Sequence, residues 1–288
     1  MKILVTGANG QLGMSFRALA GKHGNIQFSF FDLPELDLNL FPETEALLRA
    51  EKPDVVINCA AYTAVDKAEQ EREAAWALNH LAVAHLAQLC QQTGSFLIHV
   101  STDYVFDGTS CHPYTETDSC SPVSVYGASK REGELEVLMS NAKALIVRTS
   151  WLYSEYGHNF VKTMLRLAKE RSEVRVVCDQ IGGPTYAGDL AEAIMKCIPG
   201  LSKLSTVEVL HFANAGVASW YDLALSIFEL SGLNCKVIPI STEEYPTPAR
   251  RPAYSVFNTA KIRAFIQDDI PHWRDALGRC LANMKENA

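Results

Sequence analysis

The first half of the chain alternates short apolar runs with amphipathic stretches. The apolar runs are rich in β-branched residues and predict strands, whereas the stretches between them have helical spacing. Repeated strand–helix–strand units with short connections are typical of an α/β fold, a doubly wound parallel sheet with helices on both faces. The predicted strands are Lys2–Thr6, Ile26–Phe31, Val55–Asn58, Phe96–Ser101 and Leu145–Thr149, and the predicted helices are Gln11–Lys22, Pro42–Lys52, about Asp66–Gln92 and Val125–Ser140.

The alternation becomes less regular after Trp151. Helical patterns near Phe160–Arg171, Leu190–Cys197 and Tyr221–Leu230 are separated by the Pro- and Gly-rich stretches GGPTYAG and YPTPARRP. We therefore expect residues 1–150 to form the parallel sheet, which also receives part of 205–235. Residues 151–288 are expected to form mainly a smaller C-terminal α/β lobe.

The composition is that of an ordinary globular protein. With 48% hydrophobic and 20% charged residues, the chain is neither disordered nor of low complexity. A formal net charge of −7 has the wrong sign for binding a nucleic-acid polymer, although a single phosphate-bearing ligand could be held locally. No apolar run approaches the ~20 residues of a membrane span, and the N-terminus lacks a signal-peptide pattern. We expect a cytoplasmic protein with no nucleic-acid or membrane partner.

Eight cysteines are scattered along the chain without a C-x-x-C motif. In a cytoplasmic protein such cysteines are expected to be free thiols, although Cys111 and Cys120 share a polar loop and could pair. The histidines show no H-E-x-x-H pattern. The sequence therefore gives no motif for a metal site.

Three glycines stand between the first strand and the first helix. Gly7, Gly10 and Gly13 would allow a tight turn, a close approach of backbone to a pyrophosphate and close packing of helix on strand. The helix that follows offers unpaired N–H groups to an anion. A plain Gly-rich turn is the alternative, but the strand–turn–helix context favours a dinucleotide site. Residues 1–150 are thus predicted to be a dinucleotide-binding Rossmann domain.

The end of the second predicted strand carries a carboxylate. Asp32 lies about 20 residues past the glycines, where it could accept hydrogen bonds from an adenosine ribose. Such a residue favours NAD over NADP only weakly, so the predicted cofactor is NADH or NADPH. Asp37 and Leu38 follow in a loop that could cover the adenine or simply precede the next helix.

Tyr126 and Lys130 form a Y-x-x-x-K pair at the start of the helix after the fourth strand. The spacing places both side chains on one helix face. A Lys ammonium beside a phenol lowers the phenol pKa, which suits a general acid or base. Ser101 and Thr102 end the preceding strand, at the edge where ligands bind in such sheets, and either hydroxyl could bond a substrate carbonyl.

These motifs resemble the extended, sugar-nucleotide-modifying branch of the short-chain dehydrogenase/reductase superfamily, and within it the dTDP-4-dehydrorhamnose reductase family. The resemblance covers essentially the whole chain. Its most specific segments are VSTDYVFDG at Val100–Gly108, RTSWLY at Arg148–Tyr153 and YPTPARRP at Tyr245–Pro252. Other matching segments are INCAAYTAVDKAE at Ile57–Glu69, PVSVYGASKREGE at Pro122–Glu134, NFVKTMLRLAKE at Asn159–Glu170, PTYAGDLA at Pro184–Ala191 and SWYDLA at Ser219–Ala224.

The resemblance implies an NAD(P)H-dependent oxidoreductase that reduces the C4 keto group of dTDP-4-dehydro-β-L-rhamnose to dTDP-β-L-rhamnose. This is the last step of dTDP-rhamnose biosynthesis for cell-surface polysaccharide. Tyr126 would donate the proton, Lys130 would hold the nicotinamide ribose, and the family pattern selects Thr102 as the third catalytic residue. The cofactor-binding residues so implied are Gly7, Gly10, Gln11, Leu12, Gly13, Asp32, Asp37, Leu38, Ala61, Tyr62, Thr63, Tyr126 and Lys130. The substrate-binding residues so implied are Val65, Thr102, Asp103 and Trp151.

Two substrate assignments have simple alternatives. Trp151 could pack on a deoxyhexose or could be a core residue after an apolar strand. Arg250 and Arg251 lie in a Pro-rich loop, where a guanidinium suits a nucleotide diphosphate but a solvated pair is also reasonable. We assign Arg251 to substrate binding as a hypothesis.

Some family members are described as Mg²⁺-linked dimers that use acidic side chains. At the corresponding positions this chain has Ser15 and Gly188, neither of which supplies a carboxylate. We therefore expect no metal site, no metal-linked dimer, and a monomer or a weak homodimer that takes a dTDP-sugar substrate.

Two alternative functions are compatible with the same resemblance. The first is a 4-ketoreductase acting on another nucleotide-linked deoxysugar, since the sequence does not show the pocket shape. The second is a non-catalytic regulatory subunit of methionine adenosyltransferase, a relative of this fold. Intact Thr102, Tyr126 and Lys130 argue against the second.

Overall fold

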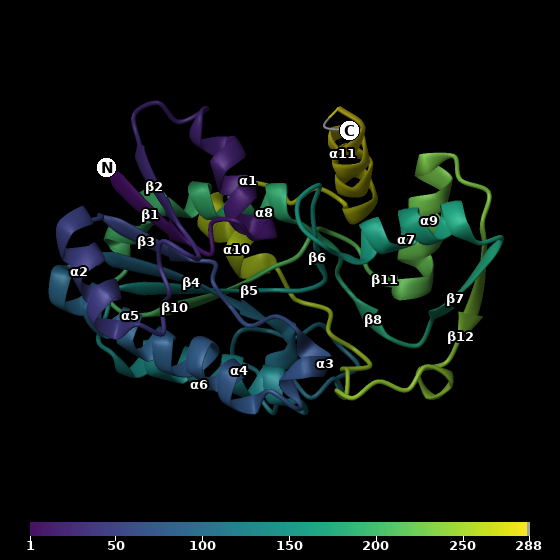
Figure 1. Ribbon diagram of the computed structural model, residues 1–288, viewed down its shortest axis with the longest axis horizontal. Coiled ribbons are helices and arrows are strands. Elements are labelled where there is room, and N and C mark those ends of the chain that lie inside the picture. Colours follow the sequence, from purple (N-terminus) through teal and green to yellow (C-terminus); the bar gives the residue numbers. More distant parts are fainter. Residues whose placement is uncertain (287–288) are drawn as a thin grey trace.

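The computed structural model describes residues 1–286 and contains a six-stranded parallel sheet in the order β10-β5-β4-β3-β1-β2 (Figure 1). Its strands are β1 (Lys2–Thr6), β2 (Gln27–Phe31), β3 (Val55–Asn58), β4 (Phe96–Thr102), β5 (Ala144–Thr149) and β10 (Glu208–Phe212). The five predicted strands are confirmed to within one residue. The strand order reverses at β1, so the carboxyl ends of β1 and β3 form the crevice in which ligands bind in such sheets.

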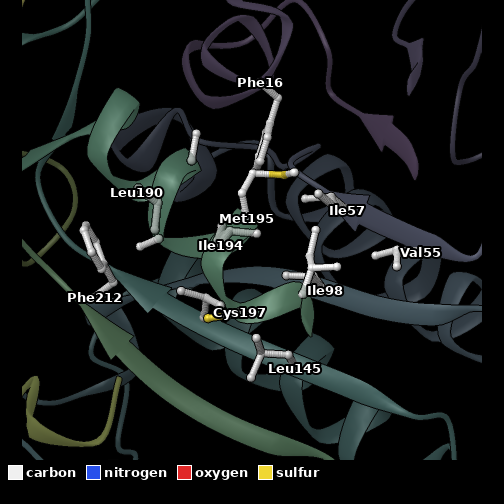
Figure 2. Packing of buried hydrophobic residues seen from close by; sticks show 14 of the residues in the cluster. Phe16, Val55, Ile57, Ile98, Leu145, Leu190, Ile194, Met195, Cys197 and Phe212 are labelled. Atoms are coloured by element: carbon white, nitrogen blue, oxygen red, sulfur yellow. The ribbon is translucent and has the colours of Figure 1, made fainter. Parts of the chain in front are cut away.

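Helices cover both faces of the sheet, which confirms the α/β doubly wound fold. One face carries α2 (Phe41–Glu51), α5 (Ala82–Thr93) and α6 (Val125–Met139), and the other carries α1 (Gln11–Ala20), α8 (Ala187–Cys197) and α10 (Ala260–Ile266). Alternate strand residues point to opposite faces. Figure 2 shows Phe16 of α1 and Ile194 of α8 together with Ile57 and Ile98 of the strands. Leu4 belongs to the core on the opposite face.

A smaller α/β lobe lies beside the sheet, at the right of Figure 1. Its parallel pair is β7 (Glu173–Val177) with β12 (Lys236–Ile240), and its helices are α7 (Phe160–Glu170), α9 (Trp220–Ser231) and α11 (Trp273–Glu286). Val176, Leu223 and Leu277 belong to its separate core. Short pairs join β6 (Leu152–Tyr153) to β9 (Thr185–Tyr186), and β8 (Ile181–Gly182) to β11 (Ala218–Ser219). Short helical turns complete the chain: η2 (Asp103–Val105), η3 (Ile198–Lys203) and η4 (Thr242–Glu244).

The single long helix predicted at about Asp66–Gln92 is wrong. The segment consists of α3 (Val65–Ala68), α4 (Arg72–Trp76), a π-helical turn η1 (Ala77–Leu81) and then α5. Between α3 and α4, the Glu69 carboxylate accepts the Val125 N–H at 2.9 Å and holds the start of α6. The polar contacts that break the helix are made to distant parts of the chain, so its local apolar spacing does not reveal them.

All eight cysteines are free thiols, so Cys111 and Cys120 do not pair. Over residues 1–286, no helix is long and apolar enough to cross a membrane.

Candidate active site

The glycine-rich turn lies where β1 and β3 end. Gly7 has a φ of +62°, and a Cβ on it would lie 2.5 Å from the Ala60 nitrogen. A Cβ on Gly13 would lie 2.4 Å from the Gly7 carbonyl oxygen. Gly10 begins α1 without a side-chain cap, which leaves the first N–H groups of the helix available to an anion. The turn therefore fits the pyrophosphate of a dinucleotide.

The side chain of Gln11 ties this turn to the smaller lobe. Its Oε1 accepts hydrogen bonds from Asn159 Nδ2 at 2.9 Å and from the Ser154 hydroxyl at 3.1 Å. Leu12 is buried in the sheet core. Because both side chains are engaged, their predicted contact with a cofactor rests on their backbone N–H groups.

Asp32 fixes the geometry of the crevice through backbone contacts. One carboxylate oxygen accepts the Asn9 N–H at 2.7 Å and the other accepts the N–H of the next residue at 2.8 Å. Asp37 accepts hydrogen bonds from Asn39, and Leu38 is buried against neighbouring leucines. Their contacts with ribose and adenine stay predictions.

The loop Ala61–Thr63, between β3 and α3, is held by a residue that the sequence did not single out. Asn79 is fully buried on the π-helical turn; its Oδ1 accepts the Tyr62 N–H at 2.8 Å, and its Nδ2 donates to the Tyr62 carbonyl at 3.0 Å. The Tyr62 hydroxyl donates to Glu71. Single π-helical turns occur frequently at functional sites. Here the turn positions a loop predicted to line the cofactor.

Thr102, Tyr126 and Lys130 come together at the carboxyl end of the sheet. Thr102 ends β4, and the other two lie in the first turns of α6. A Cβ on Gly127 would lie 2.2 Å from the Tyr104 carbonyl oxygen. The glycine therefore lets α6 approach η2, directly after β4, where Tyr126 has a hydrogen bond with the Thr102 side chain. Lys130 lies one helical turn further along α6, with its Nζ on the Val100 carbonyl of β4.

The pKa of Tyr126 differs from the sequence prediction. Burial raises the pKa of the phenol to about 12, while a hydrogen bond with Thr102 acts to lower it and the Asp103 carboxylate to raise it. The predicted lowering is therefore outweighed by burial in the ligand-free protein, in which the Lys130 Nζ donates to the Val100 carbonyl at 2.7 Å. A phenol with a high pKa keeps its proton at neutral pH, the form required of a proton donor.

A buried polar chain connects Lys130 to β1. The Thr6 hydroxyl donates to Asn58 Oδ1 at 2.7 Å, Asn58 Nδ2 lies 3.1 Å from His99 Nδ1, and His99 Nε2 lies 3.3 Å from Lys130 Nζ. Burial lowers the pKa of Lys130 to about 8 and that of His99 well below its ordinary value. The sequence analysis missed Asn58 and His99. Their only signal is that each is a polar residue in an otherwise apolar strand.

Two predicted substrate residues lie close to Tyr126. Val65 packs against the apolar cluster that contains Tyr126. Asp103 is 2% exposed and accepts a hydrogen bond from the Thr102 hydroxyl at 3.1 Å. Burial raises the pKa of Asp103 to about 6. The structure thus brings both next to the predicted proton donor.

The Trp151 ring packs against other residues and does not present an open face on which a sugar could stack. Its ring stacks on Trp220 with centroids 3.6 Å apart and planes 6° apart. A Cβ on Gly182 would lie 2.6 Å from the indole. This packing agrees with the core alternative, and contact with a sugar stays a prediction.

Arg251 is ordered by an ion pair. It lies in residues 245–258, a segment that we call the strap, and donates to both oxygens of Asp66 on α3, at 3.2 and 2.8 Å. The strap follows the loop after β4 so closely that a Cβ on Gly108 would lie 2.6 Å from Pro252. Arg250 is exposed. Arg251 is thus paired with Asp66 and partly exposed, and its contact with a substrate stays a prediction.

Behind the site, α6 is anchored to β5 by a buried ion pair. Glu134 accepts two hydrogen bonds from Arg148, each 2.8 Å long, and a third from Arg131. Arg148 also lies 3.3 Å from His211 of β10. Glu134, Arg131 and Arg148 lie within segments that carry the family resemblance, but no role was predicted for them, and His211 lies outside those segments.

Ser15 and Gly188, the positions that lack a carboxylate, are both enclosed. The Ser15 hydroxyl donates to the Gln11 carbonyl at 3.0 Å, and a Cβ on Gly188 would lie 2.6 Å from the Tyr186 ring. Within residues 1–286, no three His, Cys, Asp or Glu side chains are grouped to hold a metal ion. The expectation of no metal site stays a prediction.

The chain is similar to known proteins over nearly its full length. The family model described as the RmlD substrate binding domain matches residues 1–286. A dTDP-4-dehydrorhamnose reductase of Aggregatibacter actinomycetemcomitans is 42% identical over 96% of this chain and 97% of its own length.

Two solved structures are similar across their whole length. A dTDP-4-dehydrorhamnose reductase from Clostridium acetobutylicum has 41% identity and a TM-score of 0.93, with 99% of this chain and 100% of that chain covered. One from Bacillus anthracis, in complex with NADP, has 40% identity and a TM-score of 0.90, with 98% and 99% covered.

Proposed function

On the premise that this chain belongs to the dTDP-4-dehydrorhamnose reductase family, we propose how its own residues perform the family's reaction. The protein is an NAD(P)H-dependent oxidoreductase of dTDP-rhamnose synthesis that reduces the 4-keto group of dTDP-4-dehydro-β-L-rhamnose. The observation that carries the residue assignment is the hydrogen bond between Thr102 at the end of β4 and Tyr126 on α6, with Lys130 one helical turn further along the same helix.

Tyr126 is the proton donor in this proposal. Its buried phenol is protonated at neutral pH, and it can give that proton to the C4 oxygen as the carbonyl becomes an alcohol. Thr102 would hydrogen-bond the same oxygen and orient it. The reduced nicotinamide supplies the hydride when bound. One hydride and one proton together complete the conversion of ketone to alcohol.

The cofactor would lie along the carboxyl ends of β1, β2 and β3. The glycine turn and the first N–H groups of α1 would hold the pyrophosphate, and the loop Ala61–Thr63 would line the cofactor beyond it. Asp32, Asp37 and Leu38 would border the adenosine. Lys130 would hold the nicotinamide ribose next to Tyr126.

We propose that Arg251 binds the nucleotide diphosphate, with Val65, Asp103 and Trp151 lining the sugar pocket. The Asp66 ion pair keeps Arg251 extended toward α3. Arg251→Ala is expected to raise the KM for the nucleotide sugar far more than the KM for the cofactor. Arg250→Ala, in the same loop, is the matched control, and equal KM values in the two variants would contradict the assignment.

We propose that residues 1–150 form the cofactor domain and that 151–288 form mainly the substrate lobe. The pairing of β10 with β5 supports the return of part of 205–235 to the sheet. We further propose a cytoplasmic monomer or weak homodimer without a metal link. A sedimentation coefficient that falls when EDTA is added would show a metal-dependent oligomer and would contradict this proposal.

Reduction of another nucleotide-linked 4-ketosugar is the second candidate, because Trp151 does not present a free platform that would define one sugar. The test is to mix the protein with NADH or NADPH and dTDP-4-dehydro-β-L-rhamnose, and to follow the absorbance of the reduced nicotinamide. We expect rapid oxidation of the nicotinamide and a β-L-rhamnose product by NMR. No oxidation with either cofactor would contradict the function, and faster turnover of a different 4-ketosugar would favour the second candidate.

A further inference from the structure

The first half of the strap has few backbone groups that could hold it in place. Three of the eight residues in its segment YPTPARRP, at 245–252, are prolines, and a proline has no N–H to donate. The second half is better anchored, since the Ser255 N–H donates to the Ile181 carbonyl at 2.8 Å. The first half therefore depends on side-chain contacts.

A single side chain on α3 supplies those contacts. Asp66 accepts the Ala249 N–H at 3.2 Å, and Arg251 donates to both of its oxygens at 3.2 and 2.8 Å. Within residues 1–286, these are the only hydrogen bonds by which 246–252 reach another part of the chain. Partial burial acts to raise the pKa of Asp66, but the bonds from Arg251 and Ala249 outweigh it and lower the pKa, so the carboxylate is charged at neutral pH.

This ion pair lies close to the predicted proton donor. Val65, the neighbour of Asp66 on α3, packs in the apolar cluster that contains Tyr126. Burial raises the pKa of Tyr104, and the charges of Arg251 and Asp66 also act on it, so the pair is near this phenol. The Tyr104 ring in turn meets the Tyr126 ring with centroids 5.5 Å apart.

The ion pair leaves the arginine able to bind a second anion. A guanidinium has five N–H donors, and Asp66 takes two of them. The other three have no acceptor in the part of the chain that the structure describes, and the Arg251 side chain is 24% exposed. The donors of a planar guanidinium point in different directions, so phosphate oxygens could bind an edge turned away from Asp66.

We propose that Asp66 is a positioning residue for substrate binding, which anchors the first half of the strap and orients Arg251 toward the nucleotide diphosphate. Asp66 acts through Arg251 and need not touch the substrate. The inference rests on the proposed function, in which Arg251 binds the diphosphate. Without Asp66, the strap and the long arginine side chain must be ordered at the moment of binding, which lowers the affinity.

The first test is the affinity of the full chain for dTDP, measured by calorimetry with NADP saturating so that no turnover occurs. Asp66→Ala is expected to raise the Kd for dTDP about tenfold or more, the usual effect of losing a hydrogen bond to a charged group. The Kd for NADPH, from its fluorescence, should stay within about twofold, because the glycine-rich turn is untouched. A general structural defect would weaken both ligands. An unchanged or lower Kd for dTDP overturns the proposal.

A double variant tests whether Asp66 acts through Arg251. If it does, Asp66→Ala combined with Arg251→Ala should bind dTDP no more weakly than Arg251→Ala alone. Losses that add in the double variant overturn the proposal. Glu45→Ala is the matched control, because it removes a carboxylate from the exposed ion pair with Arg49 on α2, and it should leave both Kd values unchanged.

Asp66→Asn separates the two contacts with almost no change in shape. Its amide oxygen can still accept the Ala249 N–H, but its NH₂ group meets a second donor on Arg251. Amide hydrogen exchange over residues 245–252 should therefore match wild type in Asp66→Asn and become faster in Asp66→Ala. The Kd for dTDP in Asp66→Asn should lie between the wild-type and Asp66→Ala values.

If Asp66→Ala fails to fold, Asp66→Asn decides, and a wild-type Kd for dTDP in that variant overturns the proposal. Wild-type exchange over 245–252 in a folded Asp66→Ala would show that Asp66 does not anchor the strap. A wild-type protein that does not bind dTDP would overturn the proposed function and this inference together. Wild type and Asp66 variants that bind dTDP equally would overturn this inference alone.

Discussion

At the scale of single residues, the protonation of the site follows from burial more than from charge. Tyr126 and Tyr104 meet edge to ring with centroids 5.5 Å apart, and burial raises the pKa of both. The Tyr126 phenol also has a hydrogen bond with the Thr102 side chain, whereas Tyr104 reaches the Thr102 hydroxyl only through its backbone N–H, at 3.2 Å. We therefore expect Tyr126 to take part in the reaction and Tyr104 to contribute only to packing.

Tyr126→Phe is expected to lower turnover about 10²–10⁴-fold, the usual contribution of a positioned general acid. The thermal midpoint and the Kd for the cofactor should change little, because the phenyl ring keeps the packing. Tyr104→Phe is the control and should lose less than about tenfold. Equal losses in the two variants, followed by nicotinamide absorbance, would rule out Tyr126 as the donor.

Residues whose roles depend on local spacing could be predicted from the sequence. Tyr126 and Lys130 share a helix, and Ser101 and Thr102 end the strand before it, although only the family resemblance selected Thr102. Asn58 and Asn79 could not be predicted, because their partners lie on other elements and become neighbours only after folding. The error over the pKa of Tyr126 has a similar origin, since the sequence does not show how deeply the folded chain buries the phenol.

At the scale of elements, the helices around the site are positioned by glycines that allow them to pack closely against neighbouring backbone. The start of α1 packs on the turn after β1 so closely that no side chain fits at Gly13, whose Cβ would lie 2.4 Å from the Gly7 carbonyl oxygen. The helix ends at Gly21, where a Cβ would meet nothing within 4 Å. A side chain is therefore sterically excluded at Gly13, near the start of α1, but would fit at Gly21, at its end.

Gly13→Ala should lower the free energy of unfolding by about 1–3 kcal/mol or more, because its Cβ would overlap backbone atoms that cannot move freely. Gly21→Ala, in open space with a right-handed φ of −63°, should change it by less than about 0.5 kcal/mol. Urea denaturation measures both. If the Gly13→Ala variant had the same free energy of unfolding as the Gly21→Ala variant, the backbone around Gly13 would be able to move aside, which would contradict the prediction.

Strands were predicted more accurately than helices. A strand buried on both faces is a continuous apolar run with clear limits. The segment 65–93 keeps helical spacing throughout, yet the π-helical turn and the break at Glu69–Glu71 divide it. Polar side chains at both interruptions bind other parts of the chain: Asn79 on the π-helical turn binds the Tyr62 backbone, and Glu69 at the break accepts the Val125 N–H. Local periodicity carries no information about such contacts.

At the scale of the whole molecule, the chain passes between the two bodies more than once. The lobe begins after β5, but β10 returns to the sheet, and after β12 the strap runs between the two bodies and leads to α10, which packs on the sheet again. The sequence predicted the return of part of 205–235 but not the path of the strap. That path depends on long-range pairing, such as the Ser255 N–H with the Ile181 carbonyl at 2.8 Å.

The buried histidines should make the whole fold sensitive to acid. Burial, together with Arg148, lowers the pKa of His211 to about 3, whereas an unfolded histidine titrates near 6.5. The stabilisation from this neutral group is complete above about pH 6.5 and is lost as the pH falls toward 3, because the unfolded chain then binds the additional proton. The pKa of His99 is also lowered by burial, so His99 likewise reduces the stability of the fold as the pH falls.

His211→Gln should therefore reduce the dependence of the unfolding free energy on pH between about 6 and 4, by up to ~1.4 kcal/mol per pH unit. Comparison with wild type removes the contributions of Asp103 and Glu134, which are common to both proteins. Substitution of the exposed His112 by Gln is the control and should keep the wild-type slope. Parallel curves for wild type and His211→Gln would contradict the assignment.

The central claim is that this protein transfers a hydride from a reduced nicotinamide to C4 of a dTDP-linked ketosugar. The most direct measurement is NMR of the product formed with NADPH or NADH stereospecifically deuterated at the nicotinamide C4. With one of the two stereospecifically deuterated cofactors, we expect the product to be dTDP-β-L-rhamnose that carries deuterium at C4 of the sugar. A product with deuterium at another carbon, or consumption of the cofactor without deuterium in the sugar, would contradict the account.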